Sequence, residues 1–536
     1  MKKAAFGGLF LAVLGLGLAL RLGRLDLRPF HHDEANQAVK FGALLETGDY
    51  RYDPADHHGP TLYYLTLPAA WARGQKTLAS LDETTLRLVP ALFGIGLLIL
   101  FLLLKRGLGW QAVLGAAFLA TLSPALTYFS RFYIQESLFV FFAWAFLIAA
   151  GRFTLRRSYA WALTAGAAAG FLYATKETSI FVFAAAGGAL LIARLAGKMP
   201  PRNLPAEDPQ TPAHSALFPQ LAAGAAAALS VAFLFYSSFF RNPRGIVDSL
   251  AAFKDYLVRG IESGLHAHPW SYYLKMLLWT KSEGVIWSEA LILGLALIGI
   301  LAAVFGRPRI KRTPPDVGRD ERSAAAFWPV YLAAATLLSL IVYSAVPYKT
   351  PWNLCVFLAG FTILGGYGAA ALFRIVKPTA FRLALVFLIA AGCGQLERQN
   401  VRAQFVYPAD PRNPYVYAQT SPDFLHLVER LRGLAAVHPH GRDMLIKVVA
   451  EPDEQWPLPW YLRDFRRVGY WTNLAAAGGT EDVPVVIASA HPAEVIEQAA
   501  GESFQIEYYG LRQGALLTVF IDRALWEKYL AARSGH

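Results

Sequence analysis

Residues 4–20, AAFGGLFLAVLGLGLAL, form an unbroken apolar run directly behind Lys2 and Lys3. A helix that crosses a bilayer core of about 30 Å needs roughly 20 such residues. The run resembles a signal peptide, but no small-x-small cleavage site precedes Arg21 and Arg24. We therefore expect an uncleaved first membrane helix.

Ten further apolar runs follow, separated by loops in which Lys and Arg alternate between abundant and scarce. Only 16% of the 536 residues are charged, against about 25% in soluble proteins. Together the runs predict an all-α polytopic membrane bundle of about eleven transmembrane helices. The positive-inside rule then predicts a multi-pass protein of the plasma membrane with a cytoplasmic N-terminus. The runs lie at 86–104, 111–128, 137–151, 159–175, 179–195, 217–240, 284–306, 325–346, 352–373 and 379–395.

The hydropathy pattern changes after about residue 396. Short apolar runs such as DMLIKVVA (443–450) and VPVVIASA (483–490) alternate there with amphipathic stretches, which is typical of a small α/β domain. We predict a transmembrane domain over 1–395, with large outer loops at 21–85 and 241–283, and an extracytoplasmic α/β domain over 396–536.

The charge and cysteine content exclude some functions. The net charge of +12 comes largely from Lys and Arg in the loops between apolar runs, where they act as topology signals, so we expect no nucleic-acid partner. Cys355 and Cys393 both lie in apolar runs, which leaves no disulfide framework and no cysteine-based zinc site.

The unusual polar groups all fall in loops predicted to face outward. The largest group is PFHHDEANQAVKFGALLETGDYRYDPADHHGP (29–60), which follows the first apolar run. No charged residue falls at the centre of a predicted helix, and no internal repeat is present, so an ion-coupled transporter is disfavoured. We expect one outer site built from several loops. The other motifs are YFSRFYIQE (128–136), TKE (175–177), HAHPW (266–270) and YKTPW (348–352).

Carboxylates beside histidines suit general-base work or a divalent cation such as Mg²⁺ or Mn²⁺. Isolated cations suit an anionic leaving group. A sugar carried on a polyprenyl phosphate fits this inventory, because phosphate leaves readily and only one base is needed to activate an acceptor hydroxyl. Membrane lipids and a glycan, lipid or protein acceptor are then the expected partners.

The sequence of motifs resembles the GT-C superfamily of polyprenyl-phosphate-sugar glycosyltransferases. The motifs on which this resemblance rests are HHDE (31–34), HHGPTLYY (57–64), SRFYIQE (130–136) and TKE (175–177). The likeness is to the branch of protein O-mannosyltransferases and aminoarabinose transferases, and within it to the flippase-activity-associated proteins of N-glycosylation. KTPW (349–352) and PLPWYLRDF (457–465) add to that match.

The resemblance implies roles for individual residues. Asp33 matches the catalytic base of the first outer loop, with Glu34 beside it, and Glu136 matches the second acidic position. The residue before it is Gln135, so the family's carboxylate pair is incomplete there. The implied contacts to the donor phosphate are Arg131, Lys176 and Lys349, and those to substrate or metal are His32, His57 and His58.

Ordinary structural roles stay open for the same residues. Asp33, Glu34 and Glu136 could cap helices, and His57 and His58 precede a Gly-Pro turn. Lys176 could form a local ion pair or anchor at the membrane interface.

The favoured function is inverting transfer of a sugar on the extracytoplasmic face, in the cell envelope. The rival is a non-catalytic or flippase-associated component of a lipid-linked sugar pathway. The sequence names neither the sugar, the lipid carrier nor the acceptor.

Overall fold

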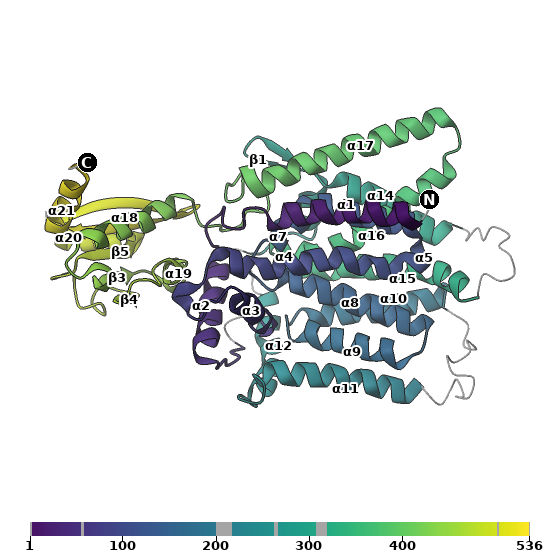
Figure 1. Ribbon diagram of the computed structural model, residues 1–536, viewed down its shortest axis with the longest axis horizontal. Coiled ribbons are helices and arrows are strands. Elements are labelled where there is room, and N and C mark those ends of the chain that lie inside the picture. The colour runs from purple at the N-terminus through teal and green to yellow at the C-terminus, as the bar shows by residue number, and fades with distance from the viewer. Residues whose placement is uncertain are drawn as a thin grey trace. The chain divides into compact units, whose positions relative to one another are not determined.

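A computed structural model of the protein describes residues 3–54, 58–199, 217–261, 266–306, 319–500 and 503–534. The described chain is mostly helical and divides into two compact units (Figure 1). The first, here the membrane unit, comprises Met1–Leu25, Asp49–Thr66 and Arg87–Val406. The second, the α/β unit, comprises Asp26–Gly48, Leu67–Leu86 and Tyr407–His536. The domain boundaries expected from the sequence stay a prediction, but the compact units do not follow a single cut near residue 395.

Ten of the eleven predicted apolar runs are largely helical, and the run at 284–306 begins with strand β2 (Val285–Trp287) before it becomes a helix at Ala290. The long helices run side by side in Figure 1, with α9 packed on α11, α14 on α16, α16 on α6 and α10 on α15. They are α1 (Lys3–Leu22), α4 (Glu83–Leu100), α6 (Trp110–Leu122), α7 (Pro124–Ser130), α8 (Glu136–Leu155), α9 (Tyr159–Tyr173), α10 (Ser179–Leu195), α11 (Leu217–Tyr236), α14 (Ala290–Phe305), α15 (Arg319–Ala345), α16 (Cys355–Ile375) and α17 (Thr379–Val401).

Shorter elements connect these helices. A two-stranded antiparallel ribbon pairs Thr280 with Trp287. The segment Thr61–Ala72 is helix α3, and it contributes residues to both units. The other connecting elements are α5 (Lys105–Leu108), α12 (Gly245–Ile261), α13 (Tyr272–Leu278), β1 (Thr280–Ser282), β2 (Val285–Trp287), and single helical turns at Phe101–Leu104, Pro351–Leu354 and Arg402–Val406.

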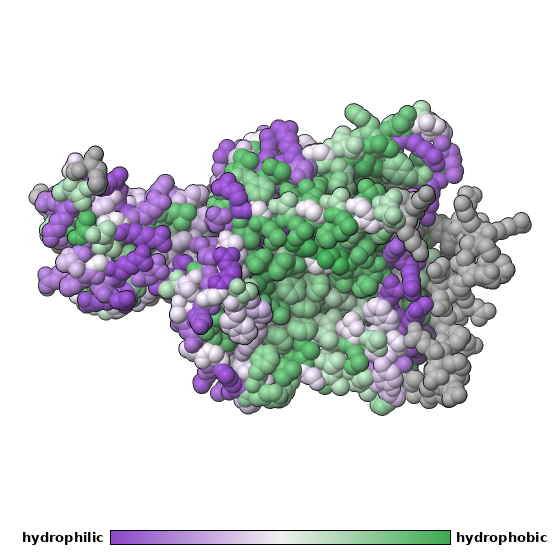
Figure 2. Space-filling view, in the orientation of Figure 1, coloured by the Kyte–Doolittle hydropathy of each residue, from purple (hydrophilic) through white to green (hydrophobic). Residues whose placement is uncertain are grey.

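The membrane unit has the surface of a multi-pass membrane protein. Seven helices among the described residues are long and apolar enough to cross a bilayer, or eight if the bent pair α6–α7 counts as one span. Large apolar side chains such as Phe218, Phe305 and Phe387 are exposed on the helices, and Figure 2 shows a hydrophobic surface over them. An apolar exterior of this extent requires lipid rather than water around it. The predicted multi-pass membrane bundle is therefore confirmed.

Small residues let these helices approach closely. A Cβ added at Gly166 of α9 would lie 1.9 Å from the carbonyl oxygen of Gly224 in α11, and one at Gly366 of α16 would lie 2.2 Å from that of Ala112 in α6. Inside a bilayer the hydrophobic effect does not drive helices together, because lipid tails are as apolar as the side chains. Van der Waals contacts between closely approaching backbones therefore stabilise the packing of membrane helices.

The α/β unit is built on a five-stranded sheet with the order β4-β3-β5-β7-β6. Strands β4, β3 and β5 are parallel, and β7 pairs antiparallel with both β5 and β6. Every residue of β3 and β5 is buried, as expected for strands covered on both faces. The predicted α/β region is thus present. Its strands are β3 (Ile446–Val449), β4 (Val468–Trp471), β5 (Val485–Ser489), β6 (Phe504–Arg512) and β7 (Ala515–Asp522).

Helices complete the α/β unit, two of them from the first loop of the chain. A cluster of Val486, Ile496 and Phe520 joins the sheet to α20. The helical segments are α2 (His32–Thr47), Leu78–Ser80, α18 (Asp423–Val437), Gly441–Asp443, Pro452–Glu454, α19 (Leu458–Tyr461), α20 (Ala490–Ala500) and α21 (Arg523–Ser534).

The PLPWYLRDF segment attaches the first loop to the rest of the α/β unit. The ring of Phe30 stacks on Trp460 at 4.8 Å, and the Phe30 N–H donates to the Tyr461 hydroxyl at 2.8 Å. The Trp460 indole donates to Glu83 at 3.0 Å. Trp460 is completely buried, so these aromatics form a core that fixes the approach to α2.

Candidate functional site

Helix α2 begins at the HHDE motif, and His31 is its N-cap. Nδ1 of His31 accepts a hydrogen bond from the Asp33 N–H at 3.0 Å, and Nε2 lies 2.9 Å from the Tyr417 carbonyl oxygen. Nδ1 must be unprotonated to accept, while Nε2 must carry the proton to donate to a carbonyl. These two contacts hold the His31 ring in a fixed orientation beside Asp33.

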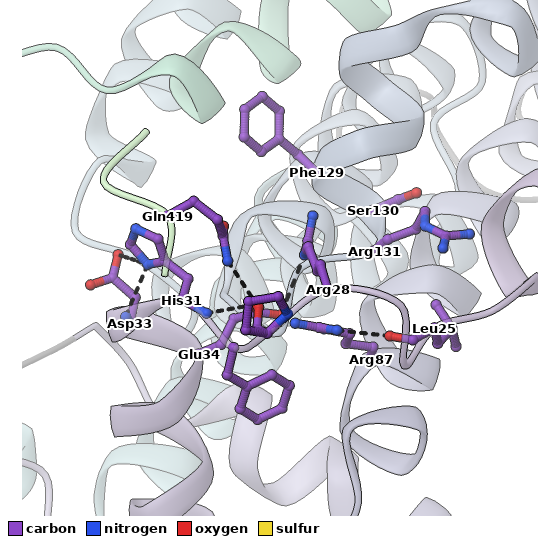
Figure 3. Close-up of polar contacts among 12 residues, drawn as sticks. Leu25, Arg28, His31, Asp33, Glu34, Arg87, Phe129, Ser130, Arg131 and Gln419 are labelled. Atoms are coloured by element: carbon purple, nitrogen blue, oxygen red, sulfur yellow. Dashed lines mark hydrogen bonds and ion pairs between the residues drawn. The ribbon is translucent and has the colours of Figure 1, made fainter. Parts of the chain in front are cut away.

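Glu34 is a structural carboxylate. It is fully buried, and its Oε2 accepts from the His31 N–H at 3.1 Å, which closes a capping box. Its Oε1 lies 3.6 Å from Nη2 of the buried Arg28. Figure 3 shows Glu34 directed at these partners. The capping role that the sequence left open is thus real for Glu34, and its predicted catalytic role stays a prediction.

Asp33 is the more accessible acid of the pair. Its side chain is 33% exposed, and its Oδ2 lies 3.7 Å from Nδ1 of His31 (Figure 3). It stands in the first turn of α2, where the helix dipole favours a carboxylate. The neighbouring Gln419 donates to the Pro29 carbonyl at 2.9 Å and so fixes the backbone that leads into the motif. Asp33 is a carboxylate on a rigid support with solvent access.

His32 lies in the same turn with different surroundings. Its ring centroid lies 6.0 Å from that of Trp456. Burial lowers the pKa of His32 below its ordinary value, although the charge of Asp33 acts in the opposite direction. A neutral His32 near pH 7 can donate or accept one hydrogen bond, and its predicted contact with substrate or metal stays a prediction.

In the membrane unit, the structure brings Glu136 and Lys176 together. Glu136 begins α8, and Lys176 lies in the turn between α9 and α10. Nζ of Lys176 is 2.6 Å from Oε1 of Glu136 and donates to Oδ1 of Asn353 at 3.2 Å. Both charged side chains are almost fully buried. A buried lysine with a carboxylate on one side can stabilise a second anion only where that anion comes close.

A second buried carboxylate in the membrane unit is Glu177, which the sequence analysis quoted within TKE but assigned no role. Nδ1 of His58 lies 2.8 Å from its Oε2, and the Tyr52 hydroxyl donates to its Oε1 at 3.1 Å. Burial acts to raise the pKa of Glu177, but His58 and the hydrogen bonds outweigh it and leave this pKa below its ordinary value. The carboxylate thus fixes the orientation of the imidazole. His57 lies outside the described residues.

Arg131 and Lys349, predicted as phosphate contacts, donate to backbone carbonyls. The Arg131 guanidinium donates to the Leu20 carbonyl at 2.7 Å and to the Arg24 carbonyl at 2.9 Å, beyond the end of α1. Nζ of Lys349 donates to the carbonyls of His268 and Val346. Burial lowers the pKa of Lys349. Helix ends leave such carbonyls without partners, so both side chains have a structural task, and their contact with phosphate stays a prediction.

The predicted Mg²⁺ or Mn²⁺ site stays a prediction as well. Across the part of the chain that the structure describes, no three His, Cys, Asp or Glu side chains cluster in a way that could hold a metal ion. Glu136 and Glu177 each use a Lys or His partner instead.

Sequence comparison gives a partial match. A profile of the dolichyl-phosphate-mannose-protein mannosyltransferases matches residues 67–201, about a quarter of the chain. This span includes Glu136, Lys176 and Glu177. No curated protein sequence matches the chain.

Comparison with solved structures covers nearly the whole chain. ArnT from Cupriavidus metallidurans bound to undecaprenyl phosphate superposes with a TM-score of 0.60 at 16% identity, covering 98% of this chain and 99% of that one. The archaeal oligosaccharyltransferase AglB from Archaeoglobus fulgidus, in complex with an inhibitory peptide and a dolichol-phosphate, gives 0.56 at 13% identity over 98% and 77%. The chain has the GT-C fold. The GT-C resemblance is confirmed, while the narrower likeness to the flippase-activity-associated group stays a prediction.

Within the GT-C fold, the confirmed parts are the helical membrane bundle and the α/β region. The side of the membrane on which the α/β unit lies, and hence the cytoplasmic placement of the N-terminus, stays a prediction. So does the plasma membrane as the location.

Proposed function

We propose that this GT-C protein transfers a sugar from a polyprenyl-phosphate donor to an acceptor on the outer face of the cell membrane, with inversion at the sugar carbon. The observation that carries the proposal is Asp33, a partly exposed carboxylate in the first turn of α2, whose N–H is held by the ring of His31. The fold adds support, since ArnT holds undecaprenyl phosphate and AglB holds a dolichol-phosphate. A glycan, lipid or protein would serve as the acceptor.

Asp33 would act as the general base. It would take the proton of the acceptor hydroxyl as that oxygen forms its bond to the sugar carbon, while the bond from this carbon to the phosphate oxygen breaks. Attack from the face opposite the phosphate inverts the carbon. A carboxylate suffices because the leaving polyprenyl phosphate is a weak base and needs no proton from an acid.

Lys176 would stabilise the departing phosphate, with Glu136 as its positioning partner. The 2.6 Å contact to Glu136 and the 3.2 Å contact to Asn353 fix the position of Nζ. An ammonium ion fixed before the reaction stabilises developing negative charge without reorganising. Asp33 and Lys176 belong to different units, and each role rests on that residue's own contacts.

The test is transfer by purified protein in lipid nanodiscs, with polyprenyl-phosphate sugars and acceptors extracted from native membranes. Asp33→Asn keeps the size of the side chain and removes the base, so we expect kcat to fall about 100- to 10,000-fold. Asp49→Asn, in the same loop with its side chain 49% exposed, is the matched control and should keep wild-type activity. Full activity in Asp33→Asn would remove Asp33 from the mechanism.

The rival function, a non-catalytic component that moves lipid-linked sugar, has its own measurement. Vesicles containing the protein would scramble a fluorescent polyprenyl-phosphate sugar between leaflets. Scrambling that is equal in wild type and in the Asp33→Asn, Glu136→Gln double variant, together with no transfer by wild type, would favour the rival.

A further inference from the structure

Arg21 is a buried arginine in the first membrane helix to which the proposed mechanism gives no role. It lies in the last turn of α1 and is only 1% exposed. Its Nη2 donates to the Ala120 carbonyl at 3.0 Å, while its Nε and Nη1 have no hydrogen-bond partner in the described structure. A buried charge without full compensation is expensive, and within membrane spans such residues persist at functional positions.

A small cavity adjoins this guanidinium and also reaches Glu136. It has room for a water molecule. A Cβ at Gly94, another lining residue, would lie 3.3 Å from Nε of Arg21 and 3.2 Å from Oγ of Ser130. The lining residues are Arg21, Gly94, Leu97, Leu126, Phe129, Ser130, Glu136, Ser137, Val140 and Cys355.

The cavity lining holds one cation and one carboxylate, Arg21 and Glu136, and Glu136 also pairs with Lys176 at 2.6 Å. A second buried carboxylate, Glu289, also acts on Cys355, but it accepts from the Ser123 hydroxyl and the Ala125 N–H and does not line the cavity. Cys355 lines the same space, and Tyr273 and Tyr343 also face the charge of Glu136. None of these neutral groups compensates a guanidinium. Glu136 is therefore the anion available to Arg21 in this cavity.

We propose that Arg21 is a positioning residue for Glu136, and that one water molecule in the cavity bridges its guanidinium to the carboxylate. A bridging water is nearly as favourable as a direct hydrogen bond and needs two to four polar partners, which Arg21, Glu136 and Ser130 supply. By holding the Glu136 carboxylate in place, Arg21 would also keep Lys176 in the position from which it acts on the phosphate. The catalytic consequence rests on the proposed function, whereas the link between Arg21 and Glu136 does not.

A double-variant cycle tests the link without any activity measurement. Apparent melting temperatures in detergent are compared for wild type, Arg21→Met, Glu136→Gln and the double variant. If the two residues interact, Arg21→Met lowers the melting temperature by at least about 2 °C more in the wild-type background than in Glu136→Gln. Arg21→Lys, which keeps the charge, should recover part of this difference. Additive effects would overturn the proposal.

The buried Arg87 is the matched control. It is also 1% exposed, but it donates to the Leu25 carbonyl at 2.7 Å and does not line the cavity. Arg87→Met combined with Glu136→Gln should be additive. A melting temperature that 10 mM inorganic phosphate raises in wild type and not in Arg21→Met would show an anion site instead, and would also overturn the water bridge.

An activity measurement then tests the consequence. If wild type transfers sugar, Arg21→Met should lower kcat and leave KM for the acceptor unchanged, because Glu136 no longer holds Lys176 in position. Arg21→Lys should recover part of kcat, and Arg87→Met should keep the wild-type value. An inactive wild type would contradict the proposed function, while the melting cycle would still decide the link. A wild-type kcat in Arg21→Met would overturn the positioning role.

Discussion

The α/β unit and the membrane unit hold their carboxylates in contrasting ways. Asp33 keeps a third of its side chain exposed, and its Oδ2 lies 3.7 Å from the His31 ring nitrogen. Glu136 and Glu177 are buried, and each touches a basic side chain at 2.6–2.8 Å. An accessible acid can exchange a proton with a substrate, whereas a buried acid in contact with a basic side chain fixes the position of that partner. Under the proposed function, proton transfer would belong to the first unit and charge placement to the second.

The largest effect on stability is expected at the buried pair. Lys176→Met leaves the carboxylate of Glu136 without its cation, which should cost about 3–5 kcal/mol of unfolding free energy. Thermal unfolding in detergent would show this as a large fall in melting temperature. The double variant Lys176→Met, Glu136→Leu should recover most of the loss, since it removes both charges. An unchanged single variant would show that the membrane unit does not depend on this pair.

A smaller loss is expected at Glu34, where the contrast lies within one motif. Glu34→Ala removes the hydrogen bond to the His31 N–H and the partner of Arg28, so we expect a loss of about 1–3 kcal/mol. Asp33→Asn, with an exposed side chain, should unfold within about 0.5 kcal/mol of wild type. Urea unfolding followed by tryptophan fluorescence would measure both. Equal losses of unfolding free energy in the two variants would show that Glu34 is no more important for stability than Asp33.

The smallest effect concerns pH and Glu177. Because its pKa is lowered in the folded protein, its contribution to stability is fully present above the unfolded value of about 4.3. That contribution is lost only as the pH falls through the lower folded pKa. In His58→Asn burial is no longer opposed by the imidazole, so the folded pKa should rise. Stability would then fall as the pH rises from 4 to 6, and melting temperatures over this range would show the reversed slope.

Sequence reasoning succeeded where local pattern decides structure. The apolar runs are helices, apart from the start of 284–306, which is strand β2, and DMLIKVVA and VPVVIASA contain the buried strands β3 and β5. Strand β4 was missed because Val468–Trp471 is short and contains a glycine. The HHDE motif was expected to be either a site or a cap, and the structure shows that Glu34 caps the helix.

The pairings between distant residues could not be predicted. His58 and Glu177 are 119 positions apart, and Lys176 and Asn353 are 177 apart. Nothing in TKE indicates which of its two charged side chains meets a histidine and which meets Glu136. In the sequence, Arg21 is only a basic residue at the end of an apolar run. Its burial in the structure could not be predicted, because the sequence does not show what packs around it.

The attachment of the first loop to PLPWYLRDF has a consequence for synthesis. The hydrogen bond from the Phe30 N–H can form only after Tyr461, 431 residues later in the chain, has been synthesised. At about 5–20 residues per second, a ribosome needs roughly 20–90 s to make that interval. The support beneath Asp33 is therefore assembled only after the last membrane helix has been made. A chain that ends before Tyr461 would carry Asp33 without this support for the backbone that leads into α2.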